Sequence, residues 1–88
     1  MTVAATIEDK LTRAFQPAAL RVIDESHLHA GHAGARPEGE THFRVEITAI
    51  AFSDQSRVAR HRLIYDALAD ELAGPVHALA LVTRAPGE

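Results

Sequence analysis

Residues 42–52, HFRVEITAIAF, form the clearest strand pattern in this sequence. Apolar and polar side chains alternate along the segment, with Phe43, Val45, Ile47 and Ala49 on one face and Arg44, Glu46 and Thr48 on the other. A strand with this period has one face in the core and one face at least partly in contact with water. The rest of the chain must therefore supply elements that cover only one side of a sheet.

Two segments are predicted to be helical. In residues 3–15 an apolar side chain recurs every fourth position, at Val3, Ile7, Leu11 and Phe15. Pro17 ends this helix, because the residue before a proline is pushed away from helical angles. The second helix follows the turn-forming SDQS at 53–56, spans about 57–72 and stops before Gly74-Pro75. Its expected apolar face carries Val58, His61, Tyr65, Leu68 and Leu72.

Strands are predicted at 19–24 and 76–83, and a loop without periodicity at 27–39. The first two strands, joined by that loop, are expected to be antiparallel, and the last strand joins the sheet after a helical crossover. This order predicts a single α+β domain over residues 1–88. Its architecture is two helices on one face of a three-stranded sheet.

Composition limits the possible classes of protein. The chain has 88 residues, 47% of them hydrophobic, which excludes a disordered protein and allows one small domain. The net charge of −3 provides no general attraction to nucleic acid. No apolar run approaches the roughly 18 residues of a membrane span, and the N-terminal residues do not resemble a signal peptide. We therefore expect a cytosolic protein without a membrane segment.

Three of the six histidines lie within residues 27–34, HLHAGHAG. Neutral imidazole binds borderline metals such as zinc and iron, so His29 and His32 are candidate ligands, with His27 expected to be a surface residue. Their spacing alone is weak evidence, because histidines in a loop of small residues are often simply solvated. The letters GHAG also match the Gly-x-x-Gly clamp of KH domains. That clamp joins two helices, whereas this segment is predicted to join two strands, so we reject the match.

His77 stands at the start of the last strand, just after Gly74-Pro75. A lone histidine in an apolar strand is more often a hydrogen-bonded core or edge residue than a ligand. Its position after a turn nevertheless allows the side chain to reach a surface cleft. His77 is therefore kept as a candidate for metal ligation beside the loop histidines.

The segment RVARHR, residues 57–62, places three arginines at the start of a helix, where the helix dipole disfavours positive charge. This arrangement indicates an anionic partner for Arg57, Arg60 and Arg62, although a solvated basic face explains it equally well. His61 is expected to pack within the domain. The sequence contains no catalytic triad, phosphate-binding loop or nucleotide-binding fingerprint, so we do not expect an enzyme.

Four blocks together resemble the BolA family: DES (24–26), GETHF (39–43), RHRLIYDAL (60–68) and ELAGPVHALAL (71–81). The resemblance covers nearly the whole chain and implies a class II KH-like α+β fold with a mixed sheet. It also implies partnership with a monothiol glutaredoxin, and cluster ligands at His77 and at His29, three positions after Ser26. One departure is Phe52-Ser53-Asp54, where the family usually has Phe-x-Gly. Aspartate tolerates left-handed angles, so the turn is expected to survive.

The absence of cysteine decides how such a cluster could be held. A [2Fe–2S] cluster needs four terminal ligands, and histidine replaces two thiolates on one iron in Rieske centres. We therefore expect His77 with His29 or His32 on one iron, and thiolates from glutaredoxin and its bound glutathione on the other. The alternatives are a DNA-binding transcriptional regulator that uses the KH-like domain and the basic helix start, and a zinc or nickel site in the loop.

Overall fold

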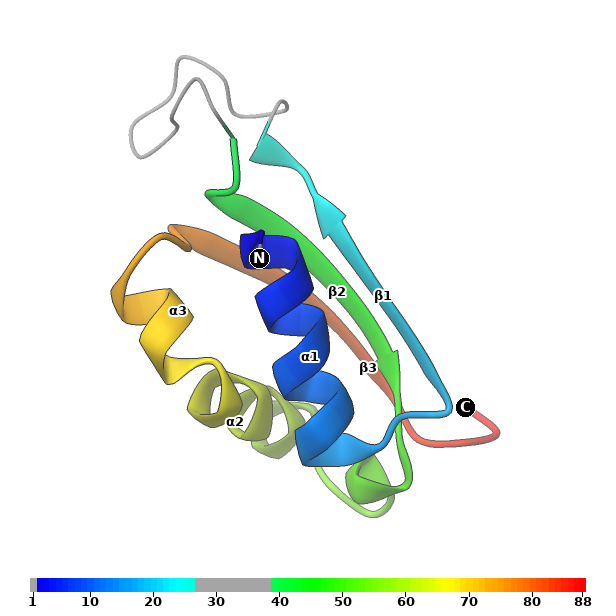
Figure 1. The fold of residues 1–88 in the computed structure, drawn as a ribbon. Helices are drawn as coiled ribbons and strands as arrows, with labels where there is room; N and C mark the ends of the chain where they lie inside the picture. The colour runs from blue at the N-terminus through cyan, green and yellow to red at the C-terminus, as the bar shows by residue number, and fades with distance from the viewer. Residues whose placement is uncertain (1, 27–38) are drawn as a thin grey trace.

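Three helices cover one face of a three-stranded mixed sheet (Figure 1). The structure is a computed structural model that describes residues 2–26 and 39–88. Its elements are α1 (Val3–Phe15), β1 (Ala19–Asp24), β2 (His42–Thr48), the 3-10 turn η2 (Ile50–Phe52), α2 (Arg57–Ala67), α3 (Ala69–Ala73) and β3 (Ala78–Arg84). This is the predicted α+β class with a class II KH-like architecture.

The middle strand β2 pairs antiparallel with β1 and parallel with β3. Register places Val45 opposite Val22 and Leu81, and these side chains face the helices together with Phe43 and Ile47. The polar positions of β2 lie on the opposite face, as the alternation predicts. Two ion pairs involve charged side chains of β2: Arg44 with Glu25, the residue after β1, at 3.1 Å, and Glu46 with Arg21 of β1 at 3.8 Å.

The first helix begins and ends where the sequence predicts. The Thr2 hydroxyl accepts a hydrogen bond from the Ala5 amide at 3.0 Å, which caps the N-terminus. Gln16 takes a left-handed conformation (φ 46°) just before Pro17 and closes the C-terminus. Ile7 and Leu11 are completely buried against the sheet, so the fourfold apolar spacing correctly identifies the packed stripe.

The predicted strand 42–52 is too long, because regular pairing ends at Thr48 and η2 follows. Phe52 has the wrong parity for the buried face of an extended strand. The 3-10 turn lets its ring enter the core, where it is fully buried and lies 5.3 Å from the Phe15 ring. Asp54 then adopts φ 63°, so aspartate supports the left-handed turn as expected.

The predicted helix 57–72 is divided at Leu68, whose backbone leaves helical angles between α2 and α3. Its predicted apolar face is also partly wrong. Ile64 and Leu68 are buried, whereas Val58 and Tyr65 are 59% and 42% exposed. More than one set of apolar residues on α2 has helical spacing, and the packing of the helix against the sheet determines which set is buried. No helix in residues 2–26 or 39–88 is long and apolar enough to cross a membrane.

The last predicted strand is displaced by a few residues. Pairing begins at Ala78 rather than at residue 76, and it continues through Arg84. Val76 is buried and its amide donates to the Glu71 carbonyl at 2.9 Å, so it belongs to the turn after α3. His77 is consequently the last residue before β3, with its side chain exposed.

Candidate functional site

Parallel pairing of β2 and β3 brings two histidines together at one end of the sheet. The Thr41 carbonyl, just before β2, accepts hydrogen bonds from the amides of His77 at 2.7 Å and Ala78 at 3.2 Å. His42 and His77 are therefore side by side, with ring centroids 5.2 Å apart and ring planes at 56°. His77 was predicted as a ligand, whereas His42 was not considered as a site residue.

His42 is held by a network of buried hydroxyl groups. The Ser26 hydroxyl accepts hydrogen bonds from the Thr41 amide at 2.9 Å, the His42 amide at 3.1 Å and the Thr41 hydroxyl at 3.3 Å. The Thr41 oxygen lies 2.8 Å from His42 Nδ1. The tautomer of His42 decides which of these two atoms donates in this contact.

The two ends of the segment between β1 and β2 are tied to the same network. The Asp24 carboxylate accepts hydrogen bonds from the Ser26 amide at 2.9 Å and the Glu40 amide at 3.1 Å. Gly39 and Glu40 both have left-handed φ angles, of 77° and 61°. The Glu40 carboxylate in turn accepts from the Val3 amide at the start of α1, at 2.8 Å. These hydrogen bonds thus join residues of the block DES (24–26) to residues of the block GETHF (39–43).

The loop candidates His29 and His32, together with His27 and the sequence GHAG, lie outside the described residues. Among residues 2–26 and 39–88, no group of three or more histidine, aspartate or glutamate side chains could hold a metal ion. The histidine pair accordingly supplies at most two ligands. Any complete coordination shell must include water, the loop or a partner.

At the opposite end of the sheet, Arg60 is committed to contacts within the domain. Its side chain is 11% exposed and donates to the Gln55 carbonyl at 3.0 Å and the Thr83 carbonyl at 3.2 Å. Two further bonds, of 2.7 and 2.8 Å, reach the Glu88 carboxylate. These hydrogen bonds from Arg60 lower the pKa of Glu88 to about 2, with help from the Ala85 amide, and Glu88 raises the pKa of Arg60. Arg60 was predicted to bind an anion of a partner, and in this structure it binds the carboxylate of Glu88 in the same chain.

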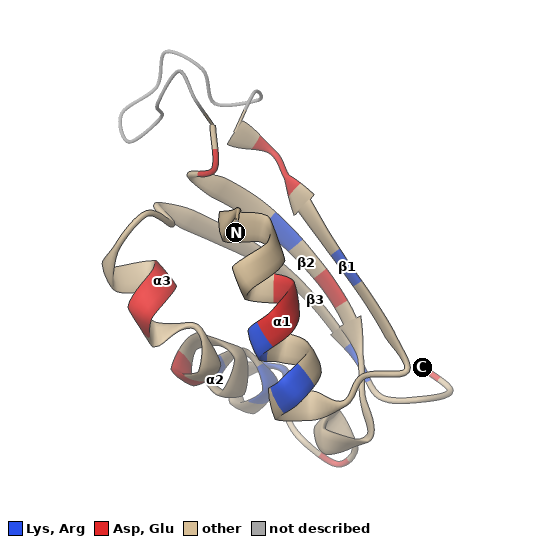
Figure 2. Ribbon diagram, in the orientation of Figure 1, with Lys and Arg blue, Asp and Glu red and all other residues tan. Residues whose placement is uncertain are grey.

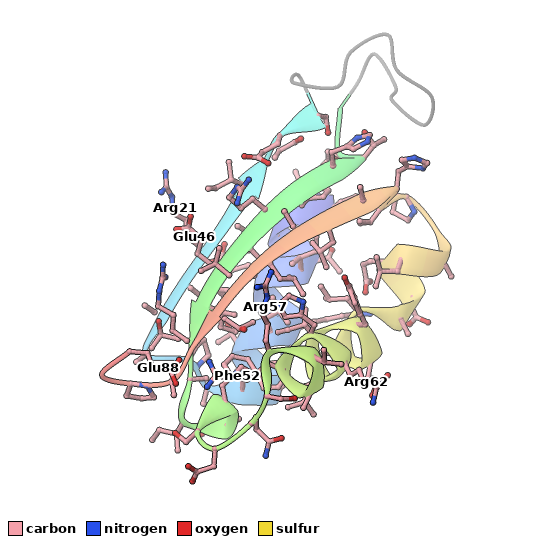
Figure 3. The ribbon with its side chains drawn as sticks, turned by 180° about the vertical axis from the view of Figure 1, so that it is seen from behind. Arg21, Glu46, Phe52, Arg57, Arg62 and Glu88 are labelled. Carbon is pink, nitrogen blue, oxygen red and sulfur yellow. The ribbon has the colours of Figure 1, made fainter. Side chains whose placement is uncertain are left out.

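Arg57 and Arg62, the other two predicted anion-binding residues, are exposed. Arg57 lines a shallow groove between α2 and β3 with Arg60, His61, Leu81, Val82 and Thr83. Arg62 projects from α2 on the side away from β3 (Figure 3). His61 is half-buried and its ring meets Tyr65 edge-on at 6.5 Å, which agrees with the expectation that it packs within the domain. The three arginines do not converge on one anion.

Charge differs between the two ends of the sheet (Figure 2). The histidine pair has carboxylates nearby in sequence and structure, at Asp24, Glu25 and Glu40. The opposite end carries Arg60, which is bound to Glu88, and the strand-terminal Arg84. Only the parallel register of β2 and β3 could have identified His42, because 35 residues separate it from His77.

Comparison with known proteins agrees with this fold and with these motifs. A protein from Sinorhizobium sp., named only as an uncharacterized protein in the cobS 5' region, is 53% identical over 89 residues, which cover 100% of this chain and 96% of that protein. The DNA-binding transcriptional regulator BolA of Escherichia coli (strain K12) is 46% identical over 83 residues, covering 94% of this chain and 75% of that protein. Other relatives are longer: the chain spans 60% of mouse BolA-like protein 1 and 23% of Arabidopsis SufE-like protein 1.

Among solved structures, the BolA domain of SufE1 from Arabidopsis thaliana superposes with a TM-score of 0.86 at 46% identity. The match covers 94% of this chain and 91% of that domain. The family described as BolA-like protein matches residues 11–88, so both histidines of the pair and all three arginines lie within the match. The mouse relative is named a BolA-like protein and the Escherichia coli relative a regulator, and neither is named an enzyme, in agreement with the expectation from the sequence. This chain belongs to the BolA-like protein family.

Proposed function

We propose that this chain is a cytoplasmic adaptor in iron–sulfur cluster trafficking and iron homeostasis. In this proposal it pairs with a monothiol glutaredoxin and shares a [2Fe–2S] cluster with it. His77 binds one iron together with a second imidazole, from His29 or His32, and the partner's cysteine and glutathione supply the thiolates. The supporting observation is the exposed imidazole of His77 on a backbone that the Thr41 carbonyl holds at 2.7 Å.

The donor chemistry of the chain fits half of such a cluster. Without cysteine it provides no thiolate, whereas imidazole is a known ligand for one iron of a [2Fe–2S] centre.

The test mixes the apo-protein with a cluster-loaded monothiol glutaredoxin and records visible absorption and circular dichroism. We expect a spectrum that differs from that of the glutaredoxin alone. His77→Ala should remove this difference, whereas His61→Ala, a matched loss of an imidazole on α2, should preserve it. An unchanged glutaredoxin spectrum with the wild-type chain would contradict the adaptor function. A wild-type spectrum with His77→Ala would contradict the ligand assignment.

A second candidate function is DNA binding, because the 46% identical Escherichia coli relative is named a DNA-binding transcriptional regulator. Exposed Arg57 and Arg62 are the residues available for phosphate contacts, since Arg60 already binds Glu88. The paired charges on the uncovered sheet face offer no additional basic surface. Binding to duplex DNA should weaken steeply with salt, and neutralising Arg57, Arg60 and Arg62 together should abolish it. Salt-independent binding, or binding that survives the triple change, would exclude this mode.

A further inference from the structure

We propose that the open edge of β3 binds an extended acidic peptide of a partner protein, which joins the sheet as an additional strand. The binding surface consists of the outward-facing backbone of β3 and the groove between β3 and α2, and is called the β3 edge below. This inference goes beyond the cluster and DNA proposals, because it requires neither a metal ligand nor a phosphate contact.

The two edge strands of the sheet, β1 and β3, differ in how they are protected. Natural proteins usually protect edge strands with charged side chains, prolines or bulges, because the free backbone groups pair readily with another chain. β1 carries the exposed Arg21 in its middle and ends at Asp24. β3 has no charged residue or proline before Arg84, and it pairs with β2 residue for residue, without a bulge. The β3 edge is therefore the one suited to accept another strand.

The backbone hydrogen bonds of β3 identify the groups that point to this edge. The Ala78 amide donates to the Thr41 carbonyl at 3.2 Å, and the Arg84 carbonyl accepts from the Ala49 amide at 3.0 Å. Successive residues of a paired strand direct their backbone groups to opposite sides, so the alternate residues from Ala78 to Arg84 bond to β2. The residues between them direct their amides and carbonyls away from β2: Leu79, Leu81 and Thr83.

The middle of this edge is unpaired. Arg60 donates to the Thr83 carbonyl at 3.2 Å, which closes one end. In the described part of the chain no backbone group bonds to Leu79 or Leu81 on the side away from β2. Two amides and two carbonyls are thus available in the spacing that an extended peptide requires.

The groove beside this edge carries positive charge. It is lined by Arg57, Arg60 and His61 of α2 and by Leu81, Val82 and Thr83 of β3, and none of these six residues is acidic. Arg60 is paired with Glu88, whereas the exposed Arg57 forms no ion pair with any residue of 2–26 or 39–88. Figure 3 shows Arg57 beside β3. A carboxylate on an added strand would supply the missing partner of Arg57.

The same charge argues against a second copy of this chain as the occupant. Self-pairing of β3 about a two-fold axis would place the same groove of each copy next to the other. The two Arg57 side chains and their neighbours would then repel one another. An acidic segment is attracted to this surface, so we assign the edge to a different, acidic protein.

The side-chain directions of β3 predict the pattern of the bound peptide. Leu79 and Leu81 pack against the core on the helix side of the sheet. Side chains of a strand alternate between the two faces, so every second residue of an added strand faces α2. Acidic residues at these positions lie near Arg57 and His61, and apolar residues between them lie on the other face. The expected ligand therefore alternates acidic and apolar residues.

The test titrates a blocked peptide of alternating glutamate and valine, as long as the 7 residues of β3, into ¹⁵N-labelled protein. We expect saturable shifts of the Leu79, Leu81 and Thr83 amides, and slower hydrogen exchange of the Leu79 and Leu81 amides. A peptide with lysine in place of glutamate should bind about tenfold more weakly or not at all. No saturable shifts, shifts confined to β1, or equal binding of the lysine peptide would overturn the proposal.

Two N-methylated peptides test the backbone bonds without altering the protein. One carries methyl groups on the glutamate amides and the other on the valine amides, so only one of them loses the amides that face β3. One peptide should bind like the parent and the other should not bind. Equal binding of both peptides would show that the contact is not a strand pairing.

Substitutions on α2 test the charge of the groove. Arg57→Gln should weaken binding of the glutamate peptide by about two- to fivefold, the effect of one exposed charge pair. Arg62→Gln, a matched change on the side of α2 away from β3, should leave binding unchanged. Equal losses for the two variants would contradict a role of the groove.

The other possible occupants are distinguished by two further measurements. A dimer of the chain alone in analytical ultracentrifugation, dissociated by the peptide, would assign the edge to a second copy and overturn the proposal. Shifts of the same amides by single-stranded oligothymidine, without any by the peptide, would assign it to nucleic acid and likewise overturn it. None of these measurements contains glutaredoxin or iron, so their failure leaves the adaptor function untouched.

Discussion

The two ends of the β2–β3 pair are both secured by side chains, but with different chemistry. At the start of the strands, the Ser26 hydroxyl and the Thr41 carbonyl hold the backbone and leave an exposed imidazole at His77. At the end of the strands, Arg60 and Glu88 form a bidentate ion pair that satisfies both charges. One end keeps a donor atom available for a ligand, whereas the other end uses its charged groups to close the fold.

The comparison shows why residue type alone is a poor guide to binding. The arginine-rich segment 57–62 is the most strongly charged motif of the sequence, yet its central arginine binds a carboxylate of the same chain. His77 is a single histidine in an apolar segment, yet it has a second imidazole beside it. Whether a group serves an outside ligand depends on what the folded chain places next to it.

The largest expected effect is at the histidine end. Ser26→Ala removes the acceptor for two buried amides and the Thr41 hydroxyl, and leaving such donors unsatisfied costs about 1–3 kcal/mol. Urea unfolding should show a loss of stability of this size. Ser53→Ala changes an exposed serine and should have little effect. Equal losses for the two variants would mean that the hydroxyl network does not secure this end.

A smaller loss of stability is expected for Arg60→Met at the opposite end of the sheet. This change removes the bonds to Glu88 and to the carbonyls of Gln55 and Thr83, so the junction of α2, β3 and the C-terminal residues should loosen. Thermal unfolding followed by circular dichroism should show a lower midpoint than wild type. Arg62→Met is the matched control, because no residue in the described part of the chain forms an ion pair with Arg62, and its midpoint should not change.

A pH series tests the ionic contact at the Arg60–Glu88 end of the sheet. The Glu88 pKa is about 2 in the folded protein, below its usual 4.5, because Arg60 donates to the ionised carboxylate. The ion pair therefore stabilises the fold above about pH 4.5, and this contribution is lost as the pH falls towards 2. Glu88→Gln should lower the unfolding midpoint slightly at pH 7 and match wild type near pH 2. A constant difference across the series would rule out the ion pair as its cause.

The smallest effect is expected on the uncovered sheet face, away from both ends. Arg21 is an exposed residue whose guanidinium lies 3.8 Å from the Glu46 carboxylate, and such surface pairs contribute little. Arg21→Gln should remain within about 0.5 kcal/mol of wild type in urea unfolding. A loss as large as that of Ser26→Ala would show that the uncovered face, too, is structurally important.

Local sequence patterns predicted most of the fold. The fourfold spacing in 3–15 and the alternation at 42–49 correctly identify a one-sided helix and a half-covered strand. The patterns failed where two signals competed. Phe52 was predicted to belong to the strand, but it is buried through the 3-10 turn η2. Ile64 and Tyr65 are adjacent apolar residues on α2, and only the packing of the helix buries the first and leaves the second exposed.

The site was only half predictable for the same reason. The sequence identified His77 from its position after a Gly-Pro turn, and the resemblance to the BolA family assigned it a role. It did not reveal His42 as its neighbour or Glu88 as the partner of Arg60, because 35 and 28 residues separate the members of these pairs. His29 and His32 remain predictions from the sequence.

The sequence by itself determined the family, the order of the three strands and the absence of any thiolate ligand, since these follow from residue identity and short periodicities. Tertiary structure alone decided which polar groups meet. The parallel register of β2 and β3 places His42 beside His77, and the packing of α2 against β3 brings Arg60 into contact with Glu88. The physical reason is that hydrogen bonding and metal ligation act over a few ångströms in space, whereas periodicity reports only neighbours along the chain.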